Sequence, residues 1–411
     1  MYIGIYISDS FISAATINQD KELVWIHDEY SKEATQLYTP LEVYIEDSYA
    51  YLGHPLSILK KSGDAMELGQ VSLKNLPQSK PYPYTDSTGT KWTNIGLLAV
   101  FLKKIKADVN LLNDKQIQCA VVCIPGLGSG PLTTAIQKAF EIAQMPLCGV
   151  IDIGRAALRG YKIYGKKNTT KEVLQCNLDE HSLSLSLLSV TEENYCTPKF
   201  FADDPKLGIA QLHQDLLLFL VKRYTELTKS KIKKSNRNEY YLKREASRLI
   251  ELYRTTNDLC FRVVCNFQAS VIEMLVTRGQ IHALIIKRTQ QILQHIKKNL
   301  KENNVALEGV TDIMITGNTA IPLPLEAALA SLFPKQNTTI HHNNSDETIM
   351  KGVVSYANNT ADREISASLL PNTSNTTKPN TKTDEETAEK SNEFYTRIDE
   401  MHINSGCDIK L

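Results

Sequence analysis

Short apolar strands alternate with amphipathic helices along most of the chain. Runs that are continuously or alternately apolar predict strands at residues 2–7, 11–17, 39–51, 119–124, 150–153, 173–190, 261–267 and 312–315. Apolar residues at helical spacing predict helices at residues 95–109, 131–144, 156–161, 211–227, 239–254, 278–301 and 324–332. Because strands and helices alternate in this way, the chain is expected to be an α/β protein.

The length of 411 residues is sufficient for two lobes that each bury a core. We expect an N-terminal lobe over residues 1–175 and a C-terminal lobe over residues 176–357. From about residue 358 the composition turns to Asn, Thr, Ser, Lys and Glu with few large apolar side chains. Such a segment cannot repay its chain entropy, so residues 358–411 are expected to form a disordered polar tail.

Composition excludes few partners but favours a cytoplasmic protein. The formal net charge is zero, which gives no general reason to expect binding to DNA or to a membrane. The N-terminus lacks a signal peptide, and no apolar run is long enough to span a bilayer. Eight scattered cysteines without a zinc-knuckle spacing predict free thiols in a reducing compartment.

One local exception to the neutral balance is the basic segment at residues 229–254. It carries nine basic and three acidic side chains. A basic helix commonly presents a solvated face, and it can also contact RNA or an acidic partner. The sequence leaves both interpretations open.

Five stretches resemble, in the same order and at similar spacing, the nucleotide-binding domain of heat-shock 70 (DnaK-type) chaperones. They are Ala120–Pro125 with the helix Thr133–Ala143, Gly149–Tyr161, Thr39-Pro40 with Leu52–Pro55, Asp312–Pro322, and Asp346-Glu347 with Gly352. The resemblance implies an actin-like ATPase fold, in which each of two lobes is built on a mixed sheet with flanking helices. It also implies a Mg²⁺-nucleotide held between two β-hairpin phosphate loops.

The phosphate loops depart from the family pattern. The first loop of the family runs Gly-Ile-Asp-Leu-Gly-Thr-Thr, whereas here Tyr6 replaces the acid and Ser8 replaces the second glycine. The second loop, Asp-Leu-Gly-Gly-Gly-Thr in the family, is Asn177-Leu-Asp-Glu-His-Ser182 here. The catalytic Glu of the family falls on Ile153. Only Lys74 suits the place of the catalytic lysine, and an ordinary surface lysine is an equally good interpretation.

These substitutions disfavour phosphate chemistry. Asp9, Asp179 and Glu180 would face a triphosphate, and like charges ~4 Å apart repel by about 4 kcal/mol at an effective dielectric of 20. We therefore expect no catalytic residue, no resident metal and no required cofactor, with at most weak ATP or ADP binding. The residues that the resemblance would place at such a nucleotide are Ser8, Asp9, Ser10, Ser182, Arg248, Gly317, Asn318 and Thr319.

The adenosine side of the family pattern is better kept. Gly317 and Thr319 remain in the turn after the strand at 312–315, but the family's arginine falls on Ala320. Arg248 lies in the helix that resembles the second adenine-side element, and a solvated helix face is the alternative interpretation. Weak nucleoside binding is therefore compatible with the sequence.

The resemblance implies a chaperone, or a subunit of a chaperone complex, that assists protein folding. The polar tail is too short for the family's peptide-binding β-sandwich and helical lid, so we expect both to be absent. An atypical ribosome-associated member of the family, which pairs with a J-domain protein, also departs from the acid of the first loop. We therefore expect a non-hydrolysing member with a J-domain co-chaperone and the ribosome as partners. Two alternatives are a divergent but working ATPase and a scaffold unrelated to folding.

Overall fold

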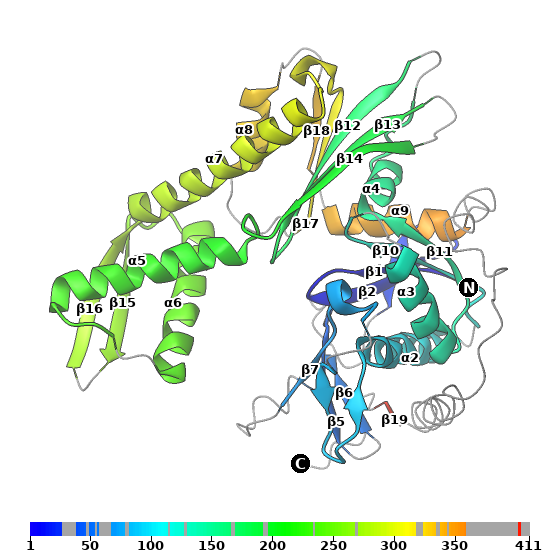
Figure 1. Cartoon of the computed structure of the whole chain (residues 1–411), viewed down its shortest axis with the longest axis horizontal. Coiled ribbons are helices and arrows are strands. Elements are labelled where there is room, and N and C mark those ends of the chain that lie inside the picture. The colour runs from blue at the N-terminus through cyan, green and yellow to red at the C-terminus, as the bar shows by residue number, and fades with distance from the viewer. Residues whose placement is uncertain are drawn as a thin grey trace, which may run out of the picture. The chain divides into compact units, whose positions relative to one another are not determined.

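The computed structural model divides into two compact units. It describes residues 1–26, 38–46, 49–53, 56, 67–78, 82–113, 116–126, 130–165, 169–191, 196–232, 235–267, 270–317, 324–333, 338–342, 345–358 and 402–403. The first unit comprises Met1–Ile163 and the chain from Glu347 onward, and the second comprises Tyr164–Asp346. The last helix therefore returns to the unit in which the chain begins (Figure 1).

A mixed sheet forms the centre of the first unit. Its strand order is β11-β10-β1-β2-β3, with β4 paired to β2. Strand β1 pairs parallel with β10 and antiparallel with β2, so that the first β-hairpin lies beside the β10–β11 crossover. The bounds are β1 (Tyr2–Ile7), β2 (Phe11–Ile17), β3 (Leu23–Ile26), β4 (Thr39–Pro40), β10 (Cys119–Ile124) and β11 (Leu147–Asp152).

Helices cover both faces of this sheet. Helices α2 (Asn94–Asn113) and α3 (Gly130–Ile142) share one apolar core with Ile3, Ile5 and Ile7 of β1. Gly4, which lies between Ile3 and Ile5, faces the other side of the sheet. A Cβ atom on Gly4 would lie 2.9 Å from Val354 of α9 (Ser345–Asn358). The period of two along β1 thus explains why one strand serves two helical layers.

Two glycines bring α9 against α4 (Ile153–Gly160). A Cβ atom on Gly160 would lie 2.0 Å from the carbonyl oxygen of Thr348, and one on Gly352 would lie 1.9 Å from that of Ala156. Only glycine allows backbones to approach this closely. The guanidinium of Arg159 also lies 4.4 Å above the ring of Tyr356, so the two helices are joined at several points.

Smaller sheets complete the first unit. One has the order β19-β6-β5-β7, and β8 pairs with β9. Strand β19 (His402–Ile403) pairs parallel with β6, and it lies within residues 394–411, for which the sequence leaves a short helix or an interaction tail open beside the disordered tail. The remaining bounds are β5 (Glu42–Glu46), β6 (Tyr49–Leu52), β7 (Gly69–Gln70), β8 (Tyr84–Thr85), β9 (Lys91–Trp92) and the 3₁₀ helix η1 (Leu73–Asn75).

The second unit contains a five-stranded mixed sheet and a small two-stranded sheet. The larger sheet has the order β14-β13-β12-β17-β18, in which β12 pairs antiparallel with β13 and parallel with β17. Its strands are β12 (Lys171–Leu178), β13 (Leu183–Val190), β14 (Cys196–Asp204), β17 (Asp312–Gly317) and β18 (Thr339–His341). The smaller sheet consists of β15 (Cys260–Phe267) and β16 (Ser270–Thr277).

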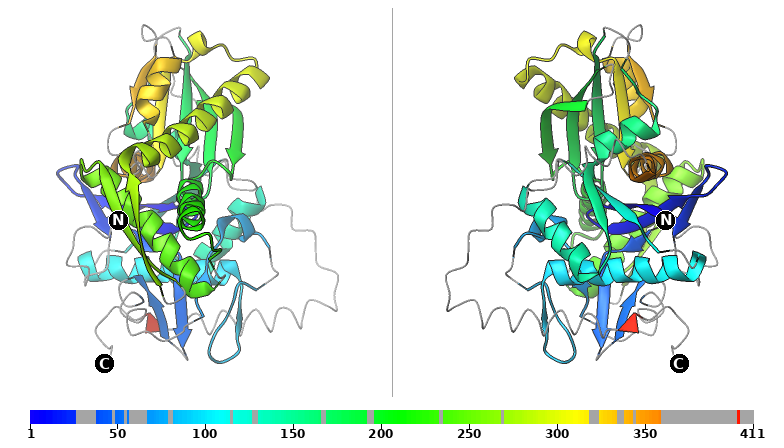
Figure 2. Two further views of the ribbon diagram at one scale, coloured as in Figure 1. Left: turned by 90° about the vertical axis from the view of Figure 1, so that its left-hand side faces the viewer. Right: turned by 90° about the vertical axis from the view of Figure 1, so that its right-hand side faces the viewer.

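Helix α7 (Arg278–Glu302) belongs to both cores of this unit. Ile281 and Ile285 pack with β15, β16, α5 (Ala210–Thr228) and α6 (Asn236–Thr255). Ile292 and Ile296, further along the same helix, pack with the larger sheet and α8 (Leu325–Leu332). The continuous helix is visible from several directions in Figures 1 and 2, and it contributes side chains to both cores. The predicted α/β class is confirmed.

The cysteines depart from expectation at one place. Cys119 and Cys148 form a disulfide, so the prediction of free thiols is wrong for this pair. The two residues are 29 positions apart in the sequence, but their strands are neighbours and their Cα atoms lie 5.5 Å apart. Within the described part of the chain, the free cysteines are Cys123, Cys176, Cys196, Cys260 and Cys265.

Candidate functional site

The turn of the first hairpin is closed by one of its own side chains. Ser8 is completely buried, and its Oγ accepts hydrogen bonds from the backbone N–H groups of Ser10 (3.2 Å) and Phe11 (3.0 Å). The same hydroxyl is 3.3 Å from the carbonyl oxygen of Phe11, to which it can donate its hydrogen. A phosphate loop works by pointing backbone N–H groups at its ligand. Here two of those groups are already bonded.

Aromatic rings fill the space beside this turn. Tyr6 is 1% exposed, and its ring meets that of Phe11 edge to face at 5.6 Å. The Phe11 ring lies 4.5 Å from Tyr38, which in turn lies 6.3 Å from Trp25. Such aromatic pairs each stabilise a fold by roughly 0.5–1.5 kcal/mol beyond the area they bury. The position of the family's metal-side acid is therefore part of an apolar cluster.

The strand β11 ends at an acid that the sequence analysis passed over. Asp152 caps α4: its carboxylate accepts from the backbone N–H of Arg155 at 2.9 Å and pairs with the Arg155 guanidinium at 3.1 Å. Burial raises the pKa of the neighbouring Cys123 thiol well above its usual range, and the Asp152 charge adds to that increase. An Asp at a strand–helix junction is a common N-cap, and that signal predicts the local role found here. The next residue, Ile153, is buried and apolar.

Lys74 lies on the 3₁₀ helix η1, and its side chain is exposed. The backbone before this helix is fixed by the N–H of Ser72, which donates to the side chain of Asn94 at 3.0 Å. The structure thus places Lys74 at the surface of the first unit. Its assignment as a catalytic lysine stays a hypothesis.

The turn of the second hairpin, in the second unit, is closed by backbone groups. The N–H groups of Ile209 and Ala210, at the start of α5, donate to the carbonyl oxygens of Asp179 (3.1 Å) and Glu180 (2.8 Å). Gly208 makes this approach possible, because a Cβ atom there would lie 2.4 Å from the carbonyl carbon of His181. These contacts fix the turn against the helix.

A chain of buried polar side chains runs beneath this turn. Ser186 donates to Gln175 at 2.8 Å, Gln175 donates to Thr316 at 3.1 Å, and Thr316 donates to Asn177 at 3.0 Å. All four side chains are buried. Asn177, which stands where the family has an acid, is therefore neutral and held by a neighbouring hydroxyl. Its Nδ2 has no hydrogen-bond partner among the described residues.

The adenosine-side residues are only partly described. Gly317 has a φ of +91°, and a Cβ atom there would lie 2.2 Å from the carbonyl oxygen of Leu178, so this position requires glycine. Asn318 and Thr319 lie outside the described residues. Arg248 binds within its own unit: its guanidinium pairs with Glu245 at 2.7 Å and donates to the carbonyl oxygen of Arg262 at 2.7 Å. Its role toward a nucleotide stays a hypothesis.

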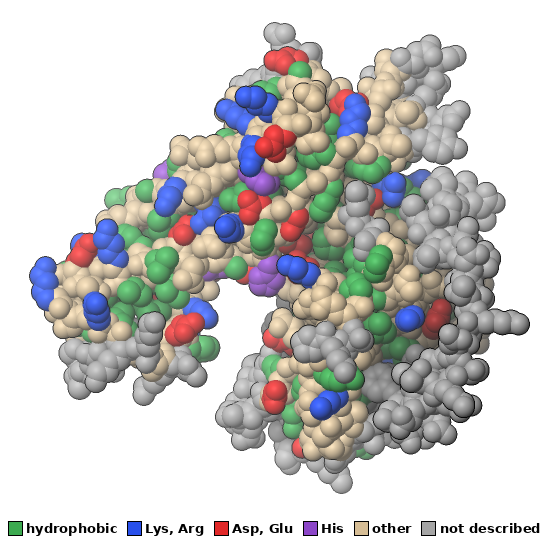
Figure 3. Space-filling model, viewed as in Figure 1, with side chains coloured by type: hydrophobic (Ala, Val, Ile, Leu, Met, Phe, Trp, Pro, Cys, Tyr) green, Lys and Arg blue, Asp and Glu red, His purple; other side chains and the backbone are tan. Residues whose placement is uncertain are grey.

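Three of the nine basic side chains of the basic segment pair with its three acids. Along α6, Glu239 pairs with Lys243, Glu245 with Arg248, and Glu251 with Arg254. On the face seen in Figure 3, acidic and basic side chains are interspersed over the helices of the second unit. Alternating charges of this kind are typical of a solvated helix face. This arrangement favours the simpler of the two interpretations of residues 229–254.

No group of three or more His, Cys, Asp or Glu side chains suited to a metal ion exists in the part of the chain that the structure describes. None of the helices described above combines the length and the apolar character that a membrane span requires.

A model of one protein family matches this chain. The family is described as Hsp70 protein, and the match covers residues 63–365, nearly three quarters of the chain. The chain therefore belongs to the Hsp70 family. Its sheets and helices are consistent with the actin-like ATPase fold of that family, and chaperone-like function follows from membership at the family level.

The Hsp70 family binds ATP or ADP with Mg²⁺, and the residues described here fit that group poorly. In the first hairpin, the N–H groups of Ser10 and Phe11 are bonded to Ser8, and Tyr6 is packed in an aromatic cluster. In the second hairpin, the turn is held to α5 and Asn177 is neutral.

Proposed function

We propose that this chain is an Hsp70-family subunit of a chaperone complex that assists protein folding without hydrolysing ATP. The observation that carries the proposal is the hydroxyl of Ser8, which occupies the backbone N–H groups of its own turn. Phosphoryl transfer depends on positioned metal and charge compensation. A turn that bonds to itself supplies neither.

The second hairpin supports the same proposal. Asp179 and Glu180 bring two acids to a turn whose carbonyl oxygens are bonded to the start of α5. Releasing that turn toward a phosphate would break two backbone hydrogen bonds, each worth about 1 kcal/mol, and would add charge repulsion. Weak binding of the nucleoside part is compatible with the glycine kept at Gly317.

Such a subunit would act through its surfaces. By similarity to the atypical member of the family, we propose a J-domain co-chaperone as the partner, at the ribosome and in the cytoplasm. The function to be measured is stimulation of folding by the J-domain partner in the absence of nucleotide. Equal stimulation with and without ATP would support the proposal. No stimulation under either condition would favour a scaffold unrelated to folding.

The direct test is calorimetric titration of the purified chain with ATP, ADP and adenosine, each with and without Mg²⁺. We expect the three ligands to bind equally weakly, because the phosphates gain no contacts. Tighter binding of ATP than of adenosine, dependent on Mg²⁺, would overturn the proposal. Steady phosphate release that Lys74→Ala abolishes would instead make the chain a divergent ATPase.

A further inference from the structure

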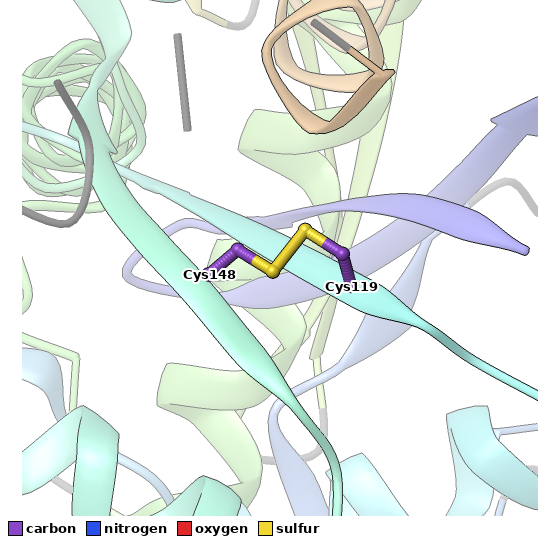
Figure 4. Close-up of a disulfide and its surroundings, with 2 residues drawn as sticks. All are labelled: Cys119 and Cys148. Atoms are coloured by element: carbon purple, nitrogen blue, oxygen red, sulfur yellow. A yellow bond between two sulfur atoms is a disulfide. The ribbon is translucent and has the colours of Figure 1, made fainter. Parts of the chain in front are cut away.

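Cys119 and Cys148 lie on neighbouring parallel strands of the first unit. Figure 4 shows the two side chains pointing toward one another from β10 and β11. Their Cα atoms are 5.5 Å apart, within the range that a disulfide bridges without backbone movement. The pair therefore needs no conformational change to form or to open.

A β-bulge explains how these two residues meet. Ala120 of β10 pairs with Leu147, whereas the next residue, Val121, pairs with Gly149. Cys148 is thus the extra residue of β11, left out of the pairing register. Bulges re-aim a side chain that the regular pleat would direct elsewhere. Here the bulge turns Cys148 toward the first residue of β10.

The two thiols differ in access. Cys148 is half-buried and lies on β11, at the edge of the described sheet, whereas Cys119 is 1% exposed. A third cysteine, Cys123, lies on β10 and is completely buried, and burial raises its pKa well above the usual range. Reactivity follows thiolate character and exposure, so Cys148 is the thiol of the three that an oxidant reaches first.

We propose that Cys119 and Cys148 form a reversible redox site for which the oxidant is a peroxide. The thiolate of Cys148 attacks one peroxide oxygen, the O–O bond breaks, and Cys148 becomes a sulfenic acid as hydroxide leaves. The thiolate of Cys119 then attacks that sulfur and forms the S–S bond, releasing a second hydroxide. Two thiols and hydrogen peroxide thus give one disulfide and two waters. A dithiol returns the two electrons by thiol–disulfide exchange.

Oxidation closes a covalent ring around one structural motif. The ring contains β10, α3 and the first two residues of β11, and the two cysteines are 29 positions apart in the sequence. It therefore ties the strand and helix of this crossover to the start of β11. Closing a loop of this length stabilises mainly by restricting the unfolded chain. The oxidised and reduced forms should share one fold and differ in thermal stability, whether or not the chain binds nucleotide.

The experiment uses the full chain, first reduced and then exposed to hydrogen peroxide. After alkylation and proteolysis, mass spectrometry should find the peptides of Cys119 and Cys148 linked, and a reductant should restore both as alkylated thiols. Melting of the oxidised form should occur roughly 5–10 °C above that of the reduced form. Cys148→Ser should lose both effects, whereas Cys123→Ser should keep both.

The wild-type protein decides the question even if a variant fails to fold. Alkylation of both cysteines after peroxide treatment would overturn the proposal. A linkage that reductant opens only after the protein is unfolded would overturn it as well, because the bond would then be a fixed part of the fold. Cross-links through the exposed Cys260, between molecules, are recognised by their different peptide masses.

Discussion

The turns of the first and second hairpins are both closed by hydrogen bonds within the protein, but different groups make these bonds. In the first unit a single hydroxyl, that of Ser8, satisfies the turn, and the closure resides in one side chain. In the second unit the start of α5 satisfies the turn through backbone groups, and the closure resides in the path of the chain around Gly208. A side-chain closure can be removed by one conservative substitution, whereas a backbone closure cannot be removed without disturbing the unit around it.

The position of the tryptophans allows the two turns to be tested separately. The chain has two, Trp25 and Trp92, and both belong to the first unit. Tryptophan fluorescence therefore follows unfolding of the first unit, while far-ultraviolet circular dichroism follows both units. If the units unfold independently, each substitution below should shift one transition and leave the other in place.

The largest effect is expected from Gly208→Ala. The added Cβ would lie 2.4 Å from a backbone carbon of the second turn, which has no flexible atom to move away. We expect the second unit to lose about 3 kcal/mol or more, because either the turn or the start of α5 must shift. Gly309→Ala is the matched control in the same unit, since nothing lies within 4 Å of its Cβ. A fluorescence transition that moves with Gly208→Ala would show that the units unfold together.

Thr316→Val should have the next largest effect. The hydroxyl of Thr316 accepts from the Gln175 side chain and donates to that of Asn177, so its loss removes this partner from the amide nitrogen of Gln175 and from the amide oxygen of Asn177. Unsatisfied buried polar groups cost about 1–3 kcal/mol each, so a loss of about 2–3 kcal/mol is expected for the second unit. Urea unfolding followed by circular dichroism measures it. Ser331→Ala, which removes an exposed hydroxyl from α8, should change the midpoint very little.

Ser8→Ala tests the first turn and should cost less. The substitution frees the N–H groups of Ser10 and Phe11, which then need water or another partner. We expect the fluorescence transition to lose about 1–2 kcal/mol, and the second unit to keep its stability. Ser10→Ala, at the neighbouring position of the turn, is the control. Equal losses for the two variants would contradict the role given to the Ser8 hydroxyl.

The smallest effect depends on pH and concerns the sheet of the second unit. Burial alone would raise the pKa of Asp312, but hydrogen bonds from His341, Thr311 and Lys171 outweigh it and hold the pKa below its usual range. Because the pKa of Asp312 is lower in the folded protein than in the unfolded chain, its charged form stabilises the fold at pH values above the unfolded pKa. This stabilisation is lost as the pH falls through the folded pKa. The free-energy difference between the wild type and Asp312→Asn should be about 1 kcal/mol at pH 7, the size of one hydrogen bond. This difference should become smaller in acid. A difference that becomes larger in acid would show that the pKa of Asp312 is not lowered in the folded protein.

Much of the fold could be predicted from the sequence because its periodicities are strong. The first hairpin and the long helix at residues 278–301 follow their apolar patterns closely, and both are present as β1–β2 and α7. Strands β14 and β16 were not predicted. Strand β14 is largely exposed, and β16 has apolar residues on both of its faces, buried at Met274 and exposed at Leu275, so neither shows a clear alternation of apolar and polar positions. Pairing with a neighbour in the sheet, rather than a local pattern, defines them.

The chemistry of the turns could be predicted less well than their positions. Ser8, Asp179 and Glu180 could be recognised in the sequence as departures from the family pattern. From them we predicted that the two acids would be the main obstacle to phosphate binding. Hydrogen bonds within the two turns are a second obstacle to phosphate binding. They depend on the positions in space of the Ser8 hydroxyl and of the start of α5, which the sequence does not give. The disulfide was missed for the same reason, because the bulge that brings Cys148 to Cys119 has no signature in the spacing of cysteines.

The close contact of α9 with α4 also bears on how the protein is made. The chain leaves the ribosome from its N-terminus, and domains generally fold as units during synthesis. Gly4 and Gly160 meet their partners on α9 only after residues near 348–354 have emerged. The second unit, whose residues all precede Glu347, has every part that it needs before that point. The unit whose synthesis begins first is thus completed last, when α9 covers the second face of its sheet.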